Sequence, residues 1–175
     1  MTRFVSEALG AQDRSAFASG HERIDRYFRE TVSQDIKRSY AACYVLVEKA
    51  SGKIAGFYTL SSHSIALTDI APELAKKMPR YPSVPAVLIG WLGRDLAFRG
   101  QAIGSLLLYD AIARLATSPV GIHALCADAI DEAAGAFYQA HQFRPFLSRP
   151  QSLYLPMKTA LALVGSAAGP LSTRP

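Results

Sequence analysis

The hydrophobic positions near the middle of the chain change period at one place. An apolar run from Val84 to Leu92 predicts a buried central strand, and apolar residues at steps of three and four between Ile103 and Leu115 predict a helix behind it. The connecting turn, residues 99–104, holds small residues and an arginine. Because the first amides of a helix are unpaired and point outward, this turn predicts a site for an anion such as a diphosphate.

The remaining periodicity predicts helices before, and strands on both sides of, this central unit. We expect a strand at Phe4–Leu9, a helix from His21 to Ser39 that pauses near Glu30, a hairpin of Ala41–Glu48 and Ile54–Ile65, a short helix at Thr68–Met78, a strand at Val120–Ala127, a helix from the Asp131 cap to Gln142, and closing strands at Phe143–Phe146 and Leu153–Met157. This order predicts an α/β (α+β) fold with a mixed, mostly antiparallel central sheet flanked by helices.

The length of the chain predicts one domain. Its 175 residues are 50% hydrophobic, which is enough for one compact core. We assign residues 1–165 to this domain. Residues 166–175 are small, polar and proline-bearing, so we expect a disordered tail there.

Charge, cysteine content and apolar stretches indicate which partners, metal sites and cellular compartments to expect. The net charge of +5 allows an anionic partner but does not require one. Cys43 and Cys126 belong to no CxxC pair, and the four histidines are widely spaced, so no metal site is expected. Buried free thiols fit a cytoplasmic protein. The N-terminus lacks the apolar core of a signal peptide, and the apolar stretch from Leu153 to Val164 is too short to span a membrane.

The turn at residues 99–104 resembles the acetyl-coenzyme A signature of the GNAT acetyltransferases. Arg99 occupies its first position and Gly104 its last, while Ala102 replaces the usual middle glycine. The segment Phe137-Tyr138, followed by Phe143, resembles the closing pattern of the same superfamily, with Gln142 in place of a glycine. The resemblance implies the GNAT fold and acetyl-coenzyme A as cosubstrate.

Four further segments resemble one subgroup, the acetyltransferase toxins of type II toxin–antitoxin pairs. They follow in the subgroup's order: Phe17–Arg29, Gln34-Asp35, Gly56–Ser61 and Leu153–Met157. The resemblance implies an enzyme that acetylates the amino group of aminoacyl-tRNA and so blocks translation. It also implies a ribbon-helix-helix antitoxin and a homodimer.

The resemblance also implies roles for individual residues. The cofactor would contact the central strand through its pantetheine arm and the helix start through its diphosphate: Leu92, Gly93, Arg94, Arg99, Gly100, Gln101, Ala102, Ile103, Gly104 and Ser105. Phosphate contacts dominate tRNA affinity, so basic side chains on the predicted helices are candidates for the tRNA surface: Arg26, Arg29, Lys37, Arg38, Lys76 and Lys77, with Arg94 beside the cofactor strand.

Acetyl transfer needs a proton donor for the departing thiolate. Tyr138 matches the tyrosine that faces the coenzyme sulfur in many of these enzymes, and a phenol suits this role. His63 and His141 are rival acid–base candidates.

Two other interpretations stay open at this point. One is a GNAT enzyme that acetylates a small-molecule or protein amine. The other is a non-catalytic coenzyme A-binding module, of which Ala102 and Gln142 would be the signs.

Overall fold

A computed structural model describes residues 2–166 of the chain. One seven-stranded sheet runs through these residues in the order β1-β2-β3-β4-β5-β7-β6. All neighbouring strands are antiparallel except β4 and β5, so the predicted mixed, mostly antiparallel sheet is confirmed. The strands are Phe4–Ala8 (β1), Ala42–Glu48 (β2), Ile54–Ala66 (β3), Ser83–Arg94 (β4), Ala124–Asp128 (β5), Arg144–Pro145 (β6) and Ser152–Pro156 (β7).

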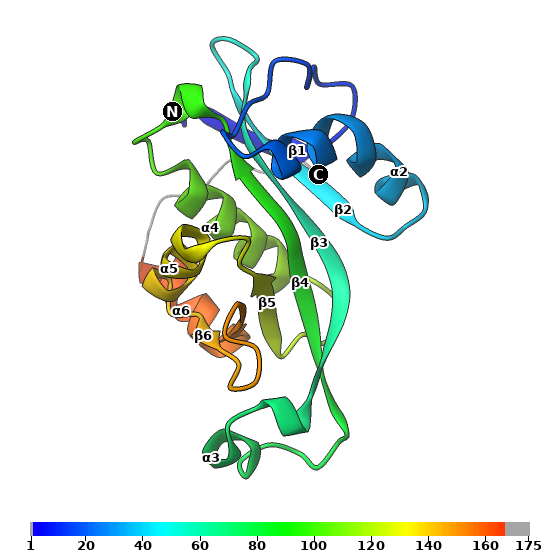
Figure 1. Cartoon of the computed structure of the whole chain (residues 1–175), viewed down its shortest axis with the longest axis vertical. Coiled ribbons are helices and arrows are strands. Elements are labelled where there is room, and N and C mark those ends of the chain that lie inside the picture. Colours follow the sequence, from blue (N-terminus) through cyan, green and yellow to red (C-terminus); the bar gives the residue numbers. More distant parts are fainter. Residues whose placement is uncertain (1, 167–175) are drawn as a thin grey trace.

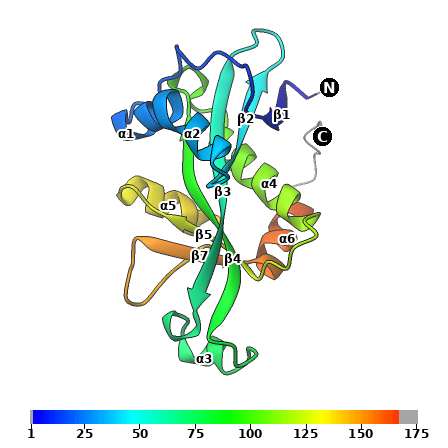
Figure 2. The same ribbon diagram turned by 90° about the vertical axis from the view of Figure 1, so that its right-hand side faces the viewer.

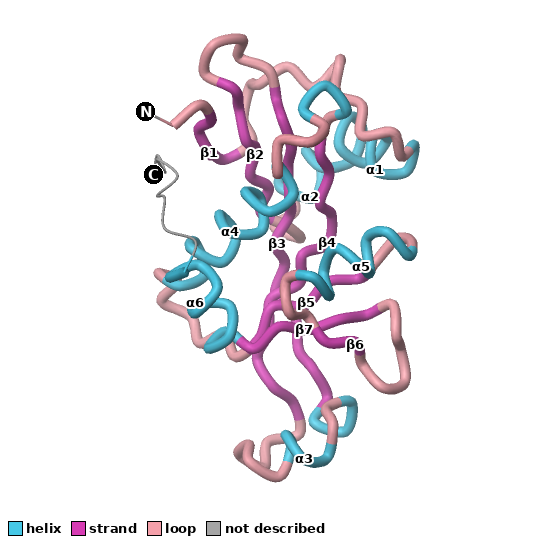
Figure 3. The backbone as a smooth tube through the Cα atoms, turned by 90° about the vertical axis from the view of Figure 1, so that its left-hand side faces the viewer, coloured by secondary structure: helices cyan, strands magenta, loops and turns pink. Residues whose placement is uncertain are grey.

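Helices lie on both faces of this sheet. They are Glu22–Arg26 (α1), Val32–Lys37 (α2), Pro72–Ala75 (α3), Ile103–Ala116 (α4), Glu132–Ala140 (α5) and Met157–Ser166 (α6), with a π segment at Tyr27–Thr31 (η1) and 3-10 turns at Leu67–Asp69 (η2) and Leu96–Phe98 (η3). Figures 2 and 3 show α1, α2 and α5 on one side of the strands and α4 and α6 on the other.

Alternation along β2 explains how both faces are buried. Val45 and Val47 pack in the cluster formed with α1 and α2, whereas Leu46, between them, packs in the cluster formed with α4. Because successive side chains of a strand point to opposite faces, a strand covered on both sides reads as a continuous apolar run. This is why β2 and the middle of β4 look uniformly hydrophobic in the sequence.

The outer halves of β3 and β4 form an arm that projects from the body of the sheet and carries α3 at its tip (Figure 1). Pairing continues along this arm to Ala66 and Ser83. The helix predicted at Thr68–Met78 is here only the turn η2 and the single turn α3. Pro72 is suited to begin a helix, but Pro79 and Pro82 prevent its extension.

The pause predicted near Glu30 is the π segment η1, which joins α1 to α2. Its wider turn brings two consecutive aromatic residues to the sheet. Phe28 stacks on Phe57 with ring centroids 3.9 Å apart, and Tyr27 stacks on Trp91 at 4.2 Å. A regular helix would turn one of the two rings further away.

The C-terminal prediction was wrong in two respects. The last described element is not a strand but the helix α6, which follows β7 directly and packs against α4. Ser166, assigned to the tail, is the last residue of α6. The rest of the predicted tail, 167–175, lies outside the described residues. The predicted strand Val120–Ala127 is also shorter, since β5 begins at Ala124.

Candidate active site

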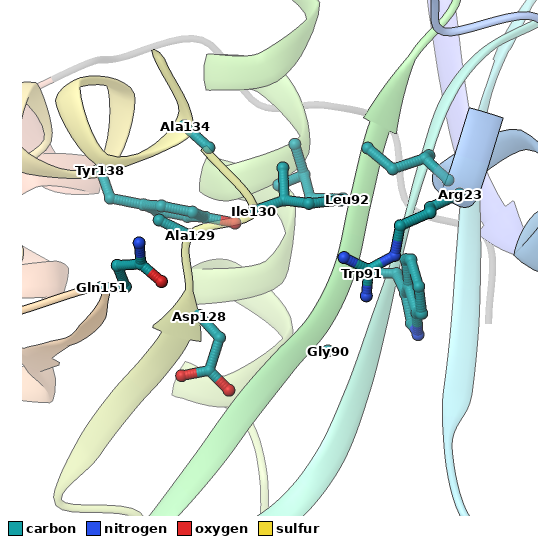
Figure 4. A pocket seen from close by; sticks show the side chains of 11 residues that line it. Arg23, Gly90, Trp91, Leu92, Asp128, Ala129, Ile130, Ala134, Tyr138 and Gln151 are labelled. Atoms are coloured by element: carbon teal, nitrogen blue, oxygen red, sulfur yellow. The ribbon is translucent and has the colours of Figure 1, made fainter. Parts of the chain in front are cut away.

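The strands β4 and β5 diverge in the middle of the sheet. They pair in parallel only from Ala86 to Ile89, opposite Ala124 to Ala127. Beyond this point β4 continues to Arg94, and no strand among residues 2–166 pairs with it on that edge. A cavity of about 280 Å³ opens in the gap, with Gly90, Trp91 and Leu92 of β4 on one wall and Asp128 and Tyr138 on the other (Figure 4).

A β-bulge shapes the β4 wall of this cavity. Leu60 lies opposite Ile89 and Tyr58 opposite Leu92, so Gly90 and Trp91 together face the single residue Thr59. The amide of Trp91 donates to Thr59 Oγ1 at 3.0 Å. A bulge changes which face each later side chain points to. Here it directs Trp91 towards Tyr27 on the α1 side, while Leu92 packs in the clusters formed with α4.

Tyr138 is placed by α5. Asp131 caps this helix by accepting a hydrogen bond from the amide of Ala134 at 2.8 Å, as predicted. The Tyr138 side chain is 5% exposed and lines the cavity, and its hydroxyl makes no hydrogen bond within residues 2–166. Burial, and secondarily the nearby Asp128 carboxylate, raise the pKa of Tyr138 above its usual value. The phenol therefore keeps its proton at neutral pH and can donate it to a ligand.

The start of α4 has the features expected of an anion site. The first backbone hydrogen bond of α4 is donated by the Leu106 amide to the carbonyl oxygen of Ala102. In the described part of the chain, the amides of Ile103, Gly104 and Ser105 have no backbone acceptor. Ala102 precedes them in the left-handed conformation, with φ 55°. Arg99 is exposed beside this turn. These groups can bind a diphosphate.

Gly104, beside the predicted anion site, lies in close contact with α5. A Cβ atom added at Gly104 would lie 3.1 Å from Phe137 Cε2, a tight contact that the Phe137 ring would have to relieve by a small shift. Next to it, Ser105 Oγ and His141 Nε2 are 3.0 Å apart. His141 Nδ1 lies 2.8 Å from the carbonyl oxygen of Phe137.

Neither of the two rival acid–base candidates, His63 and His141, lines the cavity. The ring nitrogens of His141 are engaged by Ser105 and Phe137, and His141 does not line the gap. His63 is exposed on the arm, opposite Ala86. The structure therefore leaves Tyr138 as the candidate proton donor that faces the cavity.

The predicted pantetheine residues follow the free edge of β4. Leu92 lines the cavity, and Gly93 is buried where α1 crosses the strand, since an added Cβ there would lie 2.7 Å from Ile24 Cγ2. Arg94 is half-buried and pairs through its backbone with Gly56. The sequence prediction missed Asp128 and Trp91 as lining residues, although Gly90 within a strand is a signal of a bulge.

The predicted tRNA residues fall into two groups that the structure does not bring together. Arg26, Arg29, Lys37 and Arg38 are exposed on α1, η1 and the end of α2, and Lys76 and Lys77 are exposed after α3. The two groups lie near opposite ends of the β3–β4 ladder (Figure 1). Arg26 is also ion-paired with Glu22.

Residues 2–166 contain neither a candidate metal site nor a candidate membrane-spanning helix. No group of three or more His, Cys, Asp or Glu side chains in this range could hold a metal ion. In the same range, no helix has the length and apolar character needed to cross a membrane.

Curated relatives match most of the chain. The probable toxin TacT of Sinorhizobium fredii (strain NBRC 101917 / NGR234) is 32% identical over 162 residues, covering 87% of this chain and 90% of the relative. A tRNA-acetylating toxin of Mycobacterium tuberculosis (strain ATCC 25618 / H37Rv) is 34% identical over 157 residues, covering 89% and 92%. No protein-family model matches the chain.

Solved structures with the same GNAT fold extend these matches. A tyrosine-to-phenylalanine mutant of KacT has a TM-score of 0.85 and 25% identity, covering 93% of this chain and 99% of that one. AtaT complexed with acetyl-methionyl-tRNAfMet has a TM-score of 0.83 and 26% identity, covering 91% and 98%. AtaTR bound with acetyl-coenzyme A has a TM-score of 0.79 and 25% identity, covering 93% and 99%.

Proposed function

The chain belongs to the family of tRNA-acetylating toxins, and we propose that it moves the acetyl group of acetyl-coenzyme A to the α-amino group of aminoacyl-tRNA. The observation that carries this function is the edge of β4 beyond Ile89, to which no strand within residues 2–166 pairs, together with the Tyr138 hydroxyl in the same cavity and the amides that open α4. The AtaT complexes, with acetyl-methionyl-tRNAfMet and with acetyl-coenzyme A, support the same reaction here.

The cosubstrate fits this arrangement in two parts. The extended pantetheine arm can lie along the edge of β4 at Leu92, Gly93 and Arg94, where no strand of the described part of the chain competes for the backbone. The diphosphate can bind at the turn that opens α4, with Arg99 adding a positive charge. The residues of this proposed turn site are Arg99, Gly100, Gln101, Ala102, Ile103, Gly104 and Ser105.

The chemistry asks for one proton donor in the cavity. The neutral amine forms a bond to the acetyl carbon and loses a proton, while the carbon–sulfur bond breaks and the sulfur takes up a proton. We assign Tyr138 as the donor to this sulfur. Its raised pKa keeps the phenol protonated until negative charge develops on the leaving group.

The two basic groups supply the proposed tRNA surface. Arg26, Arg29, Lys37 and Arg38 lie on the elements beside the cavity, whose lining includes Arg23 of α1, and Lys76 and Lys77 lie at the far end of the arm. A substrate that touched both groups would extend beyond the cavity. This arrangement suits a polynucleotide better than a small amine, whose recognition needs only the cavity itself.

The partner and the assembly are proposals of the same kind. We propose an antitoxin of the ribbon-helix-helix type whose acidic, initially disordered tail covers the basic groups, together with a homodimeric toxin in the cytoplasm. Purification from the native host should return a small acidic-tailed DNA-binding protein, and sedimentation of the pure toxin should give twice the chain mass. A monomeric mass would contradict the homodimer, and a toxin recovered without a partner would contradict the antitoxin.

Incubation with charged tRNA and acetyl-labelled acetyl-coenzyme A tests the function directly. Label should appear in the tRNA fraction, be absent with uncharged tRNA, and leave that fraction after mild alkaline hydrolysis of the ester. The Tyr138→Phe variant is the matched control for background transfer. Label that appears on free amino acids or polyamines but not on charged tRNA would replace this function with small-amine acetylation.

A further inference from the structure

We infer that Asp128 binds the α-ammonium group of the aminoacyl ester and holds it beside Tyr138. This inference rests on the proposed function, since it names the group that recognises the acceptor of that reaction. Asp128 is the last residue of β5 and lines the cavity where β4 has already diverged. In Figure 4 its carboxylate points into the gap between the two strands.

The carboxylate is oriented by its neighbour on β7. Ser152 lies opposite Asp128 in the ladder, and its hydroxyl donates to Asp128 Oδ1 at 2.6 Å. Within residues 2–166 the other oxygen, Oδ2, makes no hydrogen bond. One oxygen is thus fixed by the protein, and the second is available to accept a hydrogen bond from a ligand in the cavity.

The charges around the cavity direct a cation to this place. Asp128 is the one acidic side chain among the described lining residues, and Arg23 of α1 stands on the opposite wall (Figure 4). Tyr138 of α5 and Gln151 beside β7 complete the polar lining on the Asp128 side. An ammonium group is attracted to Asp128 and repelled from Arg23, so it should enter on the Tyr138 side of the gap.

An ammonium group bound to Asp128 would lie close to Tyr138, the proposed proton donor. Asp128 and Tyr138 line the same cavity. Burial, and secondarily the Asp128 carboxylate, raise the pKa of the Tyr138 phenol. Once the amine is neutral, a hydrogen bond from one of its N–H groups to Asp128 fixes its orientation and so limits the direction of its lone pair. The amine then lies beside the same phenol that is proposed to protonate the sulfur, so acceptor and leaving group meet on one wall.

The experiment compares two tRNA pools and three variants of the full-length protein. Nitrous acid treatment of charged tRNA replaces the α-amino group by a hydroxyl, which removes the cation and leaves the ester. Wild-type protein should bind the untreated pool about ten- to a hundredfold more tightly, as expected for a charge-assisted hydrogen bond. Asp128→Asn should abolish that preference and lower kcat/KM for charged tRNA by a similar factor, with the KM for acetyl-coenzyme A unchanged.

Two controls separate this role from loss of charge or of structure. Asp131→Asn removes the same charge three residues away while keeping a side chain that caps α5, and it should behave as wild type. Ser152→Ala keeps the carboxylate and should retain the preference for the untreated pool. Asp128→Asn that still prefers the untreated pool, or that raises the KM for acetyl-coenzyme A as strongly, would overturn the inference.

The outcome for the proposed function is read from the wild-type protein alone. If wild type transfers no acetyl group to charged tRNA, the proposed function fails and this inference falls with it. If wild type transfers acetyl groups and Asp128→Asn does so equally well, with an equal pool preference, only the role of Asp128 is wrong.

Discussion

Ala102 and Gln142 adopt the same left-handed backbone conformation, with φ of 55° and 67°. Ala102 precedes the first turn of α4, and Gln142 follows the last turn of α5. The hydrogen bond between Ser105 and His141 joins these two helix ends. Both residues stand where the GNAT resemblance expects a glycine. The fold has therefore kept the conformation that favours glycine at each position, even though another residue is present.

This conformation predicts that Ala102→Gly stabilises the protein. A left-handed alanine costs more than a glycine there, and we expect the free energy of unfolding to rise by about 0.5–1 kcal/mol. Urea denaturation measures the change. Ala113→Gly, at an exposed position within α4, is the matched control and should lose about 1 kcal/mol. Equal losses in both variants would show that Ala102 carries no strain.

The second prediction concerns the diphosphate site. Arg99→Glu places a carboxylate beside the unpaired amides of α4, so acetyl-coenzyme A should bind at least tenfold more weakly and raise the melting temperature much less than in wild type. Calorimetry and thermal unfolding measure the two effects. Arg80→Glu, exposed near the arm tip, makes the same charge change far from the turn and should bind normally. Undiminished binding in Arg99→Glu would remove the diphosphate from this turn.

The sequence predicted the order of strands along the chain well, because the apolar positions of most segments follow either the spacing of a strand or that of a helix. The first strand, the hairpin, the central strand and the Asp131 cap were all confirmed. It could not show the π segment η1, because the wider turn accompanies the stacking of Tyr27 on Trp91 and of Phe28 on Phe57, which are distant in the sequence. Such contacts depend on tertiary packing.

The α6 error has a different cause. Apolar residues resume at Ala160 after only two polar ones, Lys158 and Thr159, so the boundary between the strand and the helix is not marked by a turn signal such as glycine. Met157, Ala160 and Leu163 recur at steps of three, a helical spacing, and pack in the cluster formed with α4. At the site, the β-bulge was missed for a similar reason: pairing of Thr59 with two residues of β4 depends on strand register, which the sequence alone does not contain.

The third prediction is that alkaline pH destabilises the fold. Burial raises the pKa of Cys43 and of Cys126 to about 12, and the Asp128 carboxylate adds to the effect on Cys126. The unfolded thiols ionise near pH 9, so the folded state binds more protons above that pH. The free energy of unfolding should be constant near neutrality. It should then fall as pH rises from 9 towards 12, by up to about 1.4 kcal/mol per pH unit for each thiol.

Urea denaturation at pH 7.5, 9 and 10.5 measures this slope. The double variant Cys43→Ala, Cys126→Ala should begin from a lower stability but lose less of it between pH 9 and 10.5. Tyr27, Tyr58 and Tyr138, whose pKa values are also raised by burial, would account for the remainder. A wild-type profile that stays flat to pH 10.5 would mean that the thiols ionise without unfolding.

The last prediction concerns Tyr138. Tyr138→Phe removes one hydroxyl that makes no hydrogen bond within the described residues and keeps the ring that packs against Phe143 at 5.1 Å. Stability should therefore change by less than about 0.5 kcal/mol, since no protein partner is left unsatisfied. The rate of acetyl transfer should fall by about 10²–10⁴-fold, which is the usual worth of a positioned general acid.

Binding separates loss of the acid from loss of the site. Acetyl-coenzyme A is held in our proposal by the α4 turn and the edge of β4, so Tyr138→Phe should bind it with nearly wild-type affinity, and its expression should no longer arrest growth. Tyr109→Phe removes a hydroxyl from a tyrosine outside the described cavity lining and should stay active. If Tyr138→Phe acetylates charged tRNA at the wild-type rate, the phenol is only a core aromatic. The sulfur would then take its proton from water that enters the gap, since neither His63 nor His141 lines it.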